Sequence, residues 1–307
     1  MNNLLKMAKK YHAHECVDKS EFQRKARILQ AIWRKEKGYP VSRKGERVYG
    51  ARLEMPWAEE TLSNYMSDVA KAAVHKEVLS PERDKGKLYS KPRIFNNLLS
   101  SQPLCFNLFA EVQQNLELAT SVVQDMGLKQ VENVTAVEFE LSPGRGDPEY
   151  TGDRSAFDVF VEYRTNDGKS GFLGIEVKYH ENLLGEAASH RERYDEVALM
   201  AGCFKEESLI KLRSQPLQQI WRDHLLACSV IQHGDYDEGA FVFLYPEMNL
   251  HCRDALAEYA ECLVSDDTFK IWTLKSLVDA IQSHPGGEYV ESVRDRYLNF
   301  GKVEEKI

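Results

Sequence analysis

The sequence lacks the features that mark membrane proteins and disulfide-stabilised secreted domains. It has no apolar run of about 18 residues, the length that spans a bilayer, so we expect no membrane partner. Its N-terminal segment has no long apolar stretch ending at a small-residue cleavage site, so we expect no secretory leader. Its six cysteines are scattered without a C-x-x-C pair, which favours free thiols in a reducing cytoplasm.

A zinc site near the N-terminus stays open as an alternative. His12, His14 and Cys16 are ligand types that zinc accepts and lie close together in the sequence. No second pair of ligands follows at a suitable spacing, so the sequence gives this site little support.

Charge is unevenly distributed along the chain. The net charge is −8, which by itself argues against a nucleic-acid partner. Residues 1–50, however, hold 13 Lys/Arg and 5 Asp/Glu, so the remaining 257 residues carry −16. A basic end on an acidic body can bind phosphate, although a solvated basic helix explains the pattern equally well.

The chain divides into two regions by its patterning. Residues 20–37 are predicted to form a helix, because Ser20 and Gln23 make a capping box and apolar residues repeat at helical spacing. Residues 38–57 are typical of a loop, and the charged stretch 80–93 resembles a linker. We therefore predict a helical, partly basic region over 1–93 and a second domain over 94–307.

The second domain alternates helices and strands. Apolar–polar alternation and short apolar runs predict strands, and longer segments between them are typical of helices. The expected order is helix 94–125, strands 134–141, 156–163 and 171–181, helices 185–205 and 215–232, then strand 239–246, with helices beyond it. This order predicts an α/β fold with a mixed sheet.

Two of these strands bring charged residues together. Asp167-Gly168 is typical of a tight hairpin turn between 156–163 and 171–181. Antiparallel pairing about that turn places Asp158 roughly opposite Glu176, and Lys178 shares a strand face with Glu176. The alternative is that Glu176 and Lys178 are an ordinary solvated face of an edge strand.

Neighbouring carboxylates favour a divalent cation. Asp158 and Glu176 would repel each other and raise each other's pKa unless a cation compensates. Mg²⁺ prefers oxygen ligands, and Mn²⁺ is expected to replace it; the backbone carbonyl of Val177 is a further candidate ligand. Lys178 would orient or deprotonate an attacking water, or stabilise charge developing on phosphorus.

These residues carry a family resemblance. Phe157-Asp158 and the segment 174–179 (GIEVKY) resemble the D-x(n)-[D/E]-x-K signature of the PD-(D/E)XK nuclease superfamily in its E-x-K form. Over roughly residues 90–250 the chain is also similar to a group of uncharacterised bacterial restriction-endonuclease-like proteins, in the segments 100–109, 152–158, 175–181, 219–227 and 241–249. The superfamily's usual proline before the aspartate is Phe157 here.

The resemblance implies both a fold and a metal-binding catalytic centre. The fold is a restriction-endonuclease-like core: helix, three-stranded antiparallel meander, helix and strand in a mixed sheet, with an added α-helical N-terminal region. Asp158 and Glu176 would hold the metal and Lys178 would be the catalytic lysine. Glu111, with Glu117 as the alternative, would add an acid from the first helix, unless it is a solvated helix residue.

Several other side chains are candidates for substrate binding. Gln102 and Asn107 can hydrogen-bond a phosphate, although capping and packing explain them equally well. Arg145 and Arg154 lie in the loop between the first two strands and suit phosphate or guanine contacts. Arg222 is a candidate for a phosphate contact or a structural role.

The sequence therefore predicts a Mg²⁺-dependent endonuclease that hydrolyses DNA in bacterial restriction or defence. A homodimer is expected, because two-fold symmetry matches the duplex. Two alternatives stay open: an inactive nucleic-acid-binding module on the same fold, and a nuclease that acts on RNA or on branched or single-stranded DNA.

Overall fold

The computed structural model describes residues 3–306, and their contacts divide the chain into two compact units. Unit 1 comprises residues 1–111 and 281–307, and unit 2 comprises residues 112–280. These bounds differ from the domain boundary expected at residue 93, which stays a prediction. Among the described residues, no helix has the length and apolar character needed to span a bilayer.

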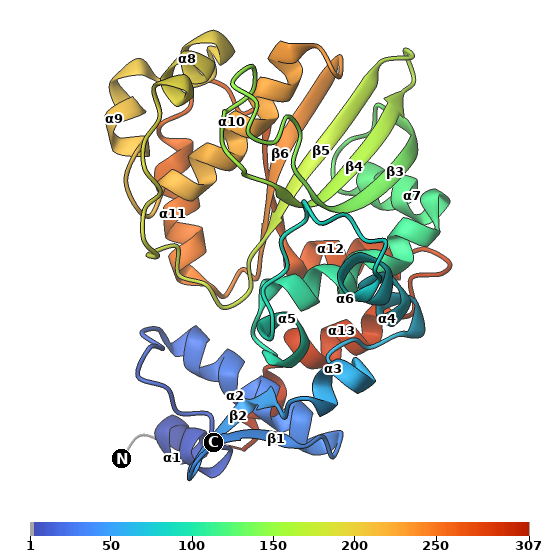
Figure 1. Cartoon of the computed structure of the whole chain (residues 1–307), viewed down its shortest axis with the longest axis vertical. Coiled ribbons are helices and arrows are strands. Elements are labelled where there is room, and N and C mark those ends of the chain that lie inside the picture. Colours follow the sequence, from blue (N-terminus) through green and yellow to red (C-terminus); the bar gives the residue numbers. More distant parts are fainter. Residues whose placement is uncertain (1–2, 307) are drawn as a thin grey trace. The chain divides into compact units, whose positions relative to one another are not determined.

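Unit 1 is mostly helical and contains one two-stranded ribbon (Figure 1). Its elements are α1 (Asn3–Lys10), α2 (Glu21–Glu36), β1 (Val41–Lys44), β2 (Arg47–Leu53), α3 (Trp57–Thr61), α4 (Asp68–Val74), the π-helix η1 (His75–Leu79), α5 (Arg93–Asn96), α13 (Val290–Tyr297) and α14 (Gly301–Glu304). Helix α6 (Ser101–Gln114) begins in unit 1 and runs into unit 2.

The predicted capping box begins α2. The Ser20 hydroxyl accepts a hydrogen bond from the backbone N–H of Gln23 at 3.1 Å. The side-chain oxygen of Gln23 accepts one from the backbone N–H of Ser20 at 3.2 Å. These bonds satisfy donors that the first turn leaves without intrahelical partners. The apolar side of α2, including Phe22, Leu29 and Trp33, is buried as the helical spacing predicts.

The expectation of a loop at 38–57 was wrong, because residues 41–53 form the ribbon. Strands β1 and β2 pair antiparallel, with Lys44 opposite Arg47. Gly45 makes the turn at φ +59°, a conformation that glycine adopts without steric cost. The Gly50 N–H donates to the carbonyl of His12 at 2.7 Å, which ties β2 to the end of α1.

Unit 2 is built on a five-stranded mixed sheet, in agreement with the expected α/β fold. The strand order is β3 (Val131–Leu141), β4 (Phe157–Thr165), β5 (Ser170–Val177), β6 (Glu238–Tyr245) and β7 (Phe269–Thr273). The first three strands form an antiparallel meander, and β5–β6 and β6–β7 are parallel. Strand β6 is almost wholly apolar because the sheet is covered on both faces.

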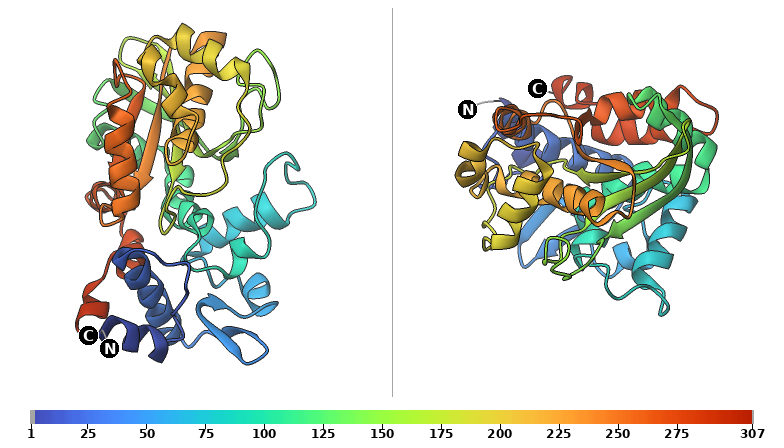
Figure 2. Two further views of the ribbon diagram at one scale, coloured as in Figure 1. Left: turned by 90° about the vertical axis from the view of Figure 1, so that its left-hand side faces the viewer. Right: turned by 90° about the horizontal axis from the view of Figure 1, so that it is seen from above.

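Helices surround this sheet. They are α7 (Leu116–Asp125), α8 (Glu192–Ala201), the short helix η2 (Glu206–Ser208), α9 (Leu209–Leu212), α10 (Gln218–His233), α11 (Leu250–Ala260) and α12 (Leu274–Gln282). Helix α10 packs on β6 and α7 packs on the outer strand β3, which Figure 2 shows from two further directions. Aromatic residues from β4, β5 and β6 meet α8, α10 and α11 in one buried cluster.

Two of the predicted helices are shorter than expected. The segment 94–125 breaks at Asn115, whose side chain accepts the Leu118 N–H at 3.0 Å and so begins α7. The segment 185–205 contains only α8, and the residues before it are irregular.

Candidate active site

The β4–β5 hairpin places Asp158 beside Glu176. The turn forms at Asp167-Gly168, where Gly168 has φ +84° and donates its N–H to the Thr165 carbonyl at 2.9 Å. Val159 then pairs with Ile175, so Asp158 and Glu176 follow directly at the end of the paired region. The hairpin therefore brings the two carboxylates to one end of adjacent strands.

Lys178 and Asp158 converge on Glu176 and Val177. The Lys178 ammonium donates to Glu176 Oε1 at 2.5 Å, and both side chains are about one-tenth exposed. The Val177 N–H donates to Asp158 Oδ2 at 2.9 Å, which fixes the orientation of that carboxylate. Two acids and one ammonium thus share one partly enclosed spot.

The electrostatics of this spot favour an additional cation. Burial raises the pKa of Asp158 well above its usual value, and the charge of Glu176 raises it further, against the opposing effect of Lys178. Burial lowers the pKa of Lys178, but the carboxylates of Glu176, Glu181 and Asp158 outweigh burial, so the net shift is upward. Lys178 is therefore an ammonium at neutral pH, and it leaves the surrounding carboxylates only partly neutralised.

The donor set fits a hard divalent cation. Mg²⁺ binds through one or two carboxylates together with water and substrate oxygens, and this end of the hairpin offers two carboxylates. Burial raises the pKa of Asp158 more than the charge of Glu176 does, and a bound cation would offset both effects. Asp158 and Glu176 would hold the ion, and the Val177 carbonyl stays a predicted further ligand.

Helix α10 contributes a residue that the sequence did not reveal as part of this site. Gln219 Nε2 donates to Glu176 Oε1 at 2.8 Å from the first turn of α10. One turn further along, Asp223 is buried, and its Oδ2 has no hydrogen-bond partner among the described residues. Burial and the charge of Glu176 raise the pKa of Asp223. Their signal in the sequence was weak, because Gln219 and Asp223 at i, i+4 spacing stand among other polar residues in the first half of the helix.

Two of the candidates for substrate binding, Asn107 and Arg222, bond to other parts of the protein, as the structural alternative for each allowed. Asn107 is buried in unit 1, where it accepts the Met66 N–H at 2.9 Å and donates to the Asn64 carbonyl at 3.1 Å. Arg222 donates to Asp153 at 2.7 Å and to the Ser155 hydroxyl at 2.8 Å. Both side chains hold the protein's own loops, which explains their polar character without a substrate.

The structure neither supports nor excludes a role in substrate or metal binding for the remaining candidates, which stay predictions. Gln102 donates to the Leu88 carbonyl at 3.2 Å and accepts the Ser90 N–H at 3.1 Å, so it holds a neighbouring loop. Arg154 is exposed and Arg145 is half-buried in the β3–β4 loop, and neither has a partner among residues 3–306. Glu111 lies at the end of unit 1, and its charge raises the pKa of Tyr289 in that unit, after the larger effect of burial.

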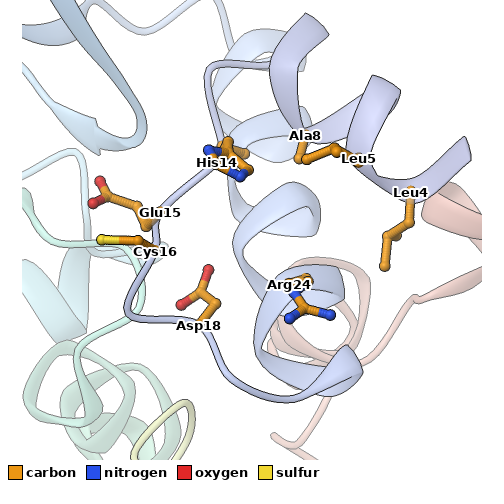
Figure 3. A pocket seen from close by; sticks show the side chains of 9 residues that line it. Leu4, Leu5, Ala8, His14, Glu15, Cys16, Asp18 and Arg24 are labelled. Atoms are coloured by element: carbon orange, nitrogen blue, oxygen red, sulfur yellow. The ribbon is translucent and has the colours of Figure 1, made fainter. Parts of the chain in front are cut away.

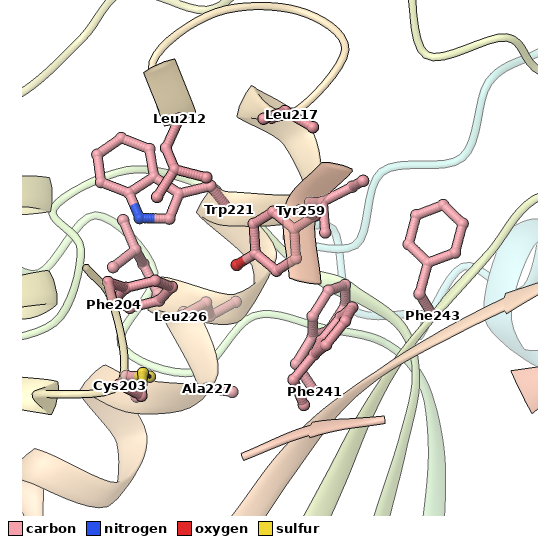
Figure 4. Close-up of a cluster of buried hydrophobic side chains, with 14 of the residues drawn as sticks. Cys203, Phe204, Leu212, Leu217, Trp221, Leu226, Ala227, Phe241, Phe243 and Tyr259 are labelled. Carbon is pink, nitrogen blue, oxygen red and sulfur yellow. Dashed lines mark hydrogen bonds between the residues drawn. The ribbon is translucent and has the colours of Figure 1, made fainter. Parts of the chain in front are cut away.

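A second group of metal-ligand types lies in the core of unit 2. Atoms of Cys203, His224 and Cys228 lie within 4.8 Å of one another, with the sulfurs 4.0 Å apart. Figure 4 shows Cys203 within the surrounding hydrophobic cluster. The two ring nitrogens of His224 lie 2.9 Å from the Tyr259 hydroxyl and 2.8 Å from the Thr268 hydroxyl. Since hydroxyl groups bond both ring nitrogens, the hydrogen-bonding capacity of the His224 ring is satisfied without a metal.

The N-terminal zinc alternative gains no support from the structure. Within the described part of the chain, the only gathered ligand group is the one in the core of unit 2. His14 and Cys16 instead line a cavity of about 380 Å³ in unit 1, together with Leu4, Ala8 and Arg24 (Figure 3).

The chain thus combines a mixed sheet with two carboxylates and a lysine at one end of the β4–β5 hairpin. The family model of the PD-(D/E)XK nuclease superfamily matches residues 17–299, and the chain belongs to this superfamily. No curated protein and no solved structure matches the chain. The match extends well into unit 1, beyond the resemblance seen from residue 90 onward.

Proposed function

We propose that the protein is a Mg²⁺-dependent endonuclease that hydrolyses phosphodiester bonds in DNA. The observation that supports this most strongly is the convergence of Asp158, Glu176 and Lys178 at one end of the β4–β5 hairpin. Membership of a nuclease superfamily supports hydrolysis of a nucleic acid, and the choice of DNA, the identity of the ion and a role in bacterial restriction or defence belong to the proposal.

Each residue has a distinct part in the proposed chemistry. A bound Mg²⁺ supplies charge that activates a water and polarises a phosphoryl oxygen. Asp158 and Glu176 supply the oxygen ligands, and the Val177 N–H keeps Asp158 in place. Lys178, held as an ammonium, stabilises the negative charge that develops on the phosphate during attack.

The raised pKa of Lys178 narrows its part in the reaction. An ammonium cannot accept a proton from the attacking water. Of the roles that the sequence left open, orientation of the water and stabilisation of charge are therefore favoured over deprotonation.

A substrate panel tests the proposal. Purified protein is incubated with duplex DNA, single-stranded DNA, branched DNA and RNA, first with Mg²⁺ or Mn²⁺ and then with EDTA. We expect cleavage of duplex DNA that EDTA and Asp158→Ala each abolish. Tight binding of DNA without cleavage under either ion would support the binding module, and preferential cleavage of RNA or branched DNA would replace the proposed substrate.

A further inference from the structure

The two units carry opposite net charge. Unit 1 holds 25 Lys/Arg and 18 Asp/Glu, a net of +7, whereas unit 2 holds 15 Lys/Arg and 30 Asp/Glu, a net of −15. The candidate active site belongs to the acidic unit, which repels a polyanion at long range. If the protein cuts DNA as proposed above, unit 1 is the more favourable source of additional phosphate contacts.

Within unit 1, exposed cations gather at the turn of the β1–β2 ribbon. Arg43, Lys44 and Arg47 are exposed on either side of Gly45, with Glu46 as the one acid of the turn. The side chains of Arg43 and Lys44 have no hydrogen-bond or ion-pair partner among the described residues. The guanidinium of Arg47 pairs with the carboxylate of Glu15 at 2.9 Å. A two-stranded ribbon is one of the shapes that the major groove of DNA admits.

In this region two aromatic rings, those of Tyr11 and Tyr49, each have two positively charged side chains beside them. The guanidinium groups of Arg47 and Arg52 lie 4.8 Å and 4.9 Å from the centre of the Tyr49 ring. The ammonium groups of Lys10 and Lys35 lie 5.8 Å and 5.4 Å from the centre of the Tyr11 ring. A ring face attracts a cation weakly and does not neutralise it, so like charges around one ring still repel each other. Glu15 offsets part of this repulsion at Arg47, and a further anion would relieve the rest.

Hydrogen bonds attach the ribbon to the segments that carry the lysines around Tyr11. The Gly50 N–H donates to the His12 carbonyl, and Arg34 Nε donates to the Gly50 carbonyl at 2.9 Å, so the ribbon is anchored to α1 and α2. A Cβ at Gly50 would lie 2.0 Å from the Tyr11 carbonyl oxygen, so this close approach requires glycine. Figures 1 and 2 show the ribbon beside α1 and α2.

The result is a basic region that we call the ribbon surface. Its cations come from the ends of α1 and α2 and from the ribbon: Lys9, Lys10, Lys35, Lys37, Arg43, Lys44, Arg47 and Arg52. Glu15, Glu36 and Glu46 are the acids of the same segments, so the eight cations exceed the acids by five.

We propose that the ribbon surface binds the phosphate backbone of duplex DNA, with the turn at Gly45 entering a groove. The exposed cations of the region suit contacts to phosphate, which strengthen binding to DNA of any sequence. This proposal rests on the proposed nuclease function for the identity of the polyanion.

Binding as a function of salt tests the proposal without cleavage. Equilibrium binding of a fluorescent duplex is measured in EDTA over a range of salt concentrations for the wild type and for Arg43→Ala/Lys44→Ala. The control is Lys76→Ala/Lys85→Ala, which removes two exposed cations of unit 1 that lie outside the ribbon surface and have no partner among the described residues. Because neither pair of side chains bonds to the rest of the described chain, both double variants are expected to fold.

We expect the ribbon variant to weaken binding about tenfold or more at moderate salt and to lower the salt slope by about 0.9 for each phosphate that the variant no longer neutralises. The control should behave as the wild type. Equal affinity and slope for the two double variants would overturn the proposal. A wild type that binds DNA through the ribbon surface yet cleaves no nucleic acid under any divalent ion would refute the nuclease function and leave the ribbon surface standing.

Discussion

At the scale of single residues, Asp158 is a carboxylate that the protein destabilises. Burial and Glu176 raise its pKa, so the folded state holds a proton more tightly than the unfolded chain does. The resulting stability is fully present below the usual pKa of aspartate and is lost as the pH rises through the raised value. Ionisation of Asp158 in the metal-free protein therefore opposes folding.

Asp158→Asn should stabilise the metal-free protein while abolishing cleavage. The amide removes the buried charge, and its oxygen can still accept the Val177 N–H. We expect a gain of about 1 kcal/mol in the free energy of unfolding near neutral pH. Thermal unfolding in EDTA measures this gain, which should shrink as the pH falls toward about 4, the usual pKa of aspartate; a loss of stability at neutral pH would contradict the electrostatic account.

At the scale of secondary-structure elements, α10 orients a metal ligand through Gln219. Gln219→Ala removes the 2.8 Å bond to Glu176, so we expect a loss of about 10- to 100-fold in metal affinity or cleavage rate. The control is Gln232→Ala on the same helix, whose side chain donates to the Val197 carbonyl instead. Titration of cleavage against Mg²⁺ compares the two; equal curves for both variants would assign Gln219 to packing alone.

The β4–β5 hairpin depends on a glycine behind the site. A Cβ at Gly174 would lie 2.4 Å from the ring of Phe157, the residue next to Asp158. Gly174→Ala should therefore cost about 1–3 kcal/mol of stability and displace Asp158, with a fall in activity. Gly185→Ala, which meets nothing within 4 Å, is the matched control, and chemical denaturation of both variants is the measurement.

Local sequence patterns predicted the β4–β5 hairpin but not the residues of other elements that contact it. Asp167-Gly168 and two alternating strands sufficed to place Asp158 opposite Glu176, because hairpin pairing is decided within about twenty residues of chain. Gln219 lies 43 residues beyond Glu176, so only the packing of α10 on the sheet brings them together. The ribbon was missed for a similar reason: β1 has only four residues, and the anchor of β2 at His12 is distant in sequence.

The roles of polar helix residues could not be decided from the sequence. For Arg222 and Asn107 the sequence left both a substrate contact and a structural role open. In the fold each meets a loop of its own unit, Arg222 at Asp153 and Asn107 at Asn64 and Met66. Residue type alone does not distinguish an arginine that binds a phosphate from one that forms an ion pair with a buried aspartate.

At the scale of the whole molecule, one chain offers one candidate centre for a duplex with two strands. We propose a homodimer on DNA, since two-fold symmetry would place one centre at each strand. The rate of double-strand cleavage should then rise more steeply than linearly with protein concentration. A strictly linear dependence, with nicked DNA as the main product, would favour a monomer.

The central claim is that Asp158, Glu176 and Lys178 form a metal-dependent phosphodiesterase centre. Its most direct test is the rate of duplex cleavage by the wild type, Asp158→Asn, Glu176→Gln and Lys178→Met, with DNA binding measured in parallel. The account predicts cleavage by the wild type only with a divalent ion, and losses of about 100-fold or more in each variant with binding retained. Folded variants that bind DNA and cut it at the wild-type rate would contradict it.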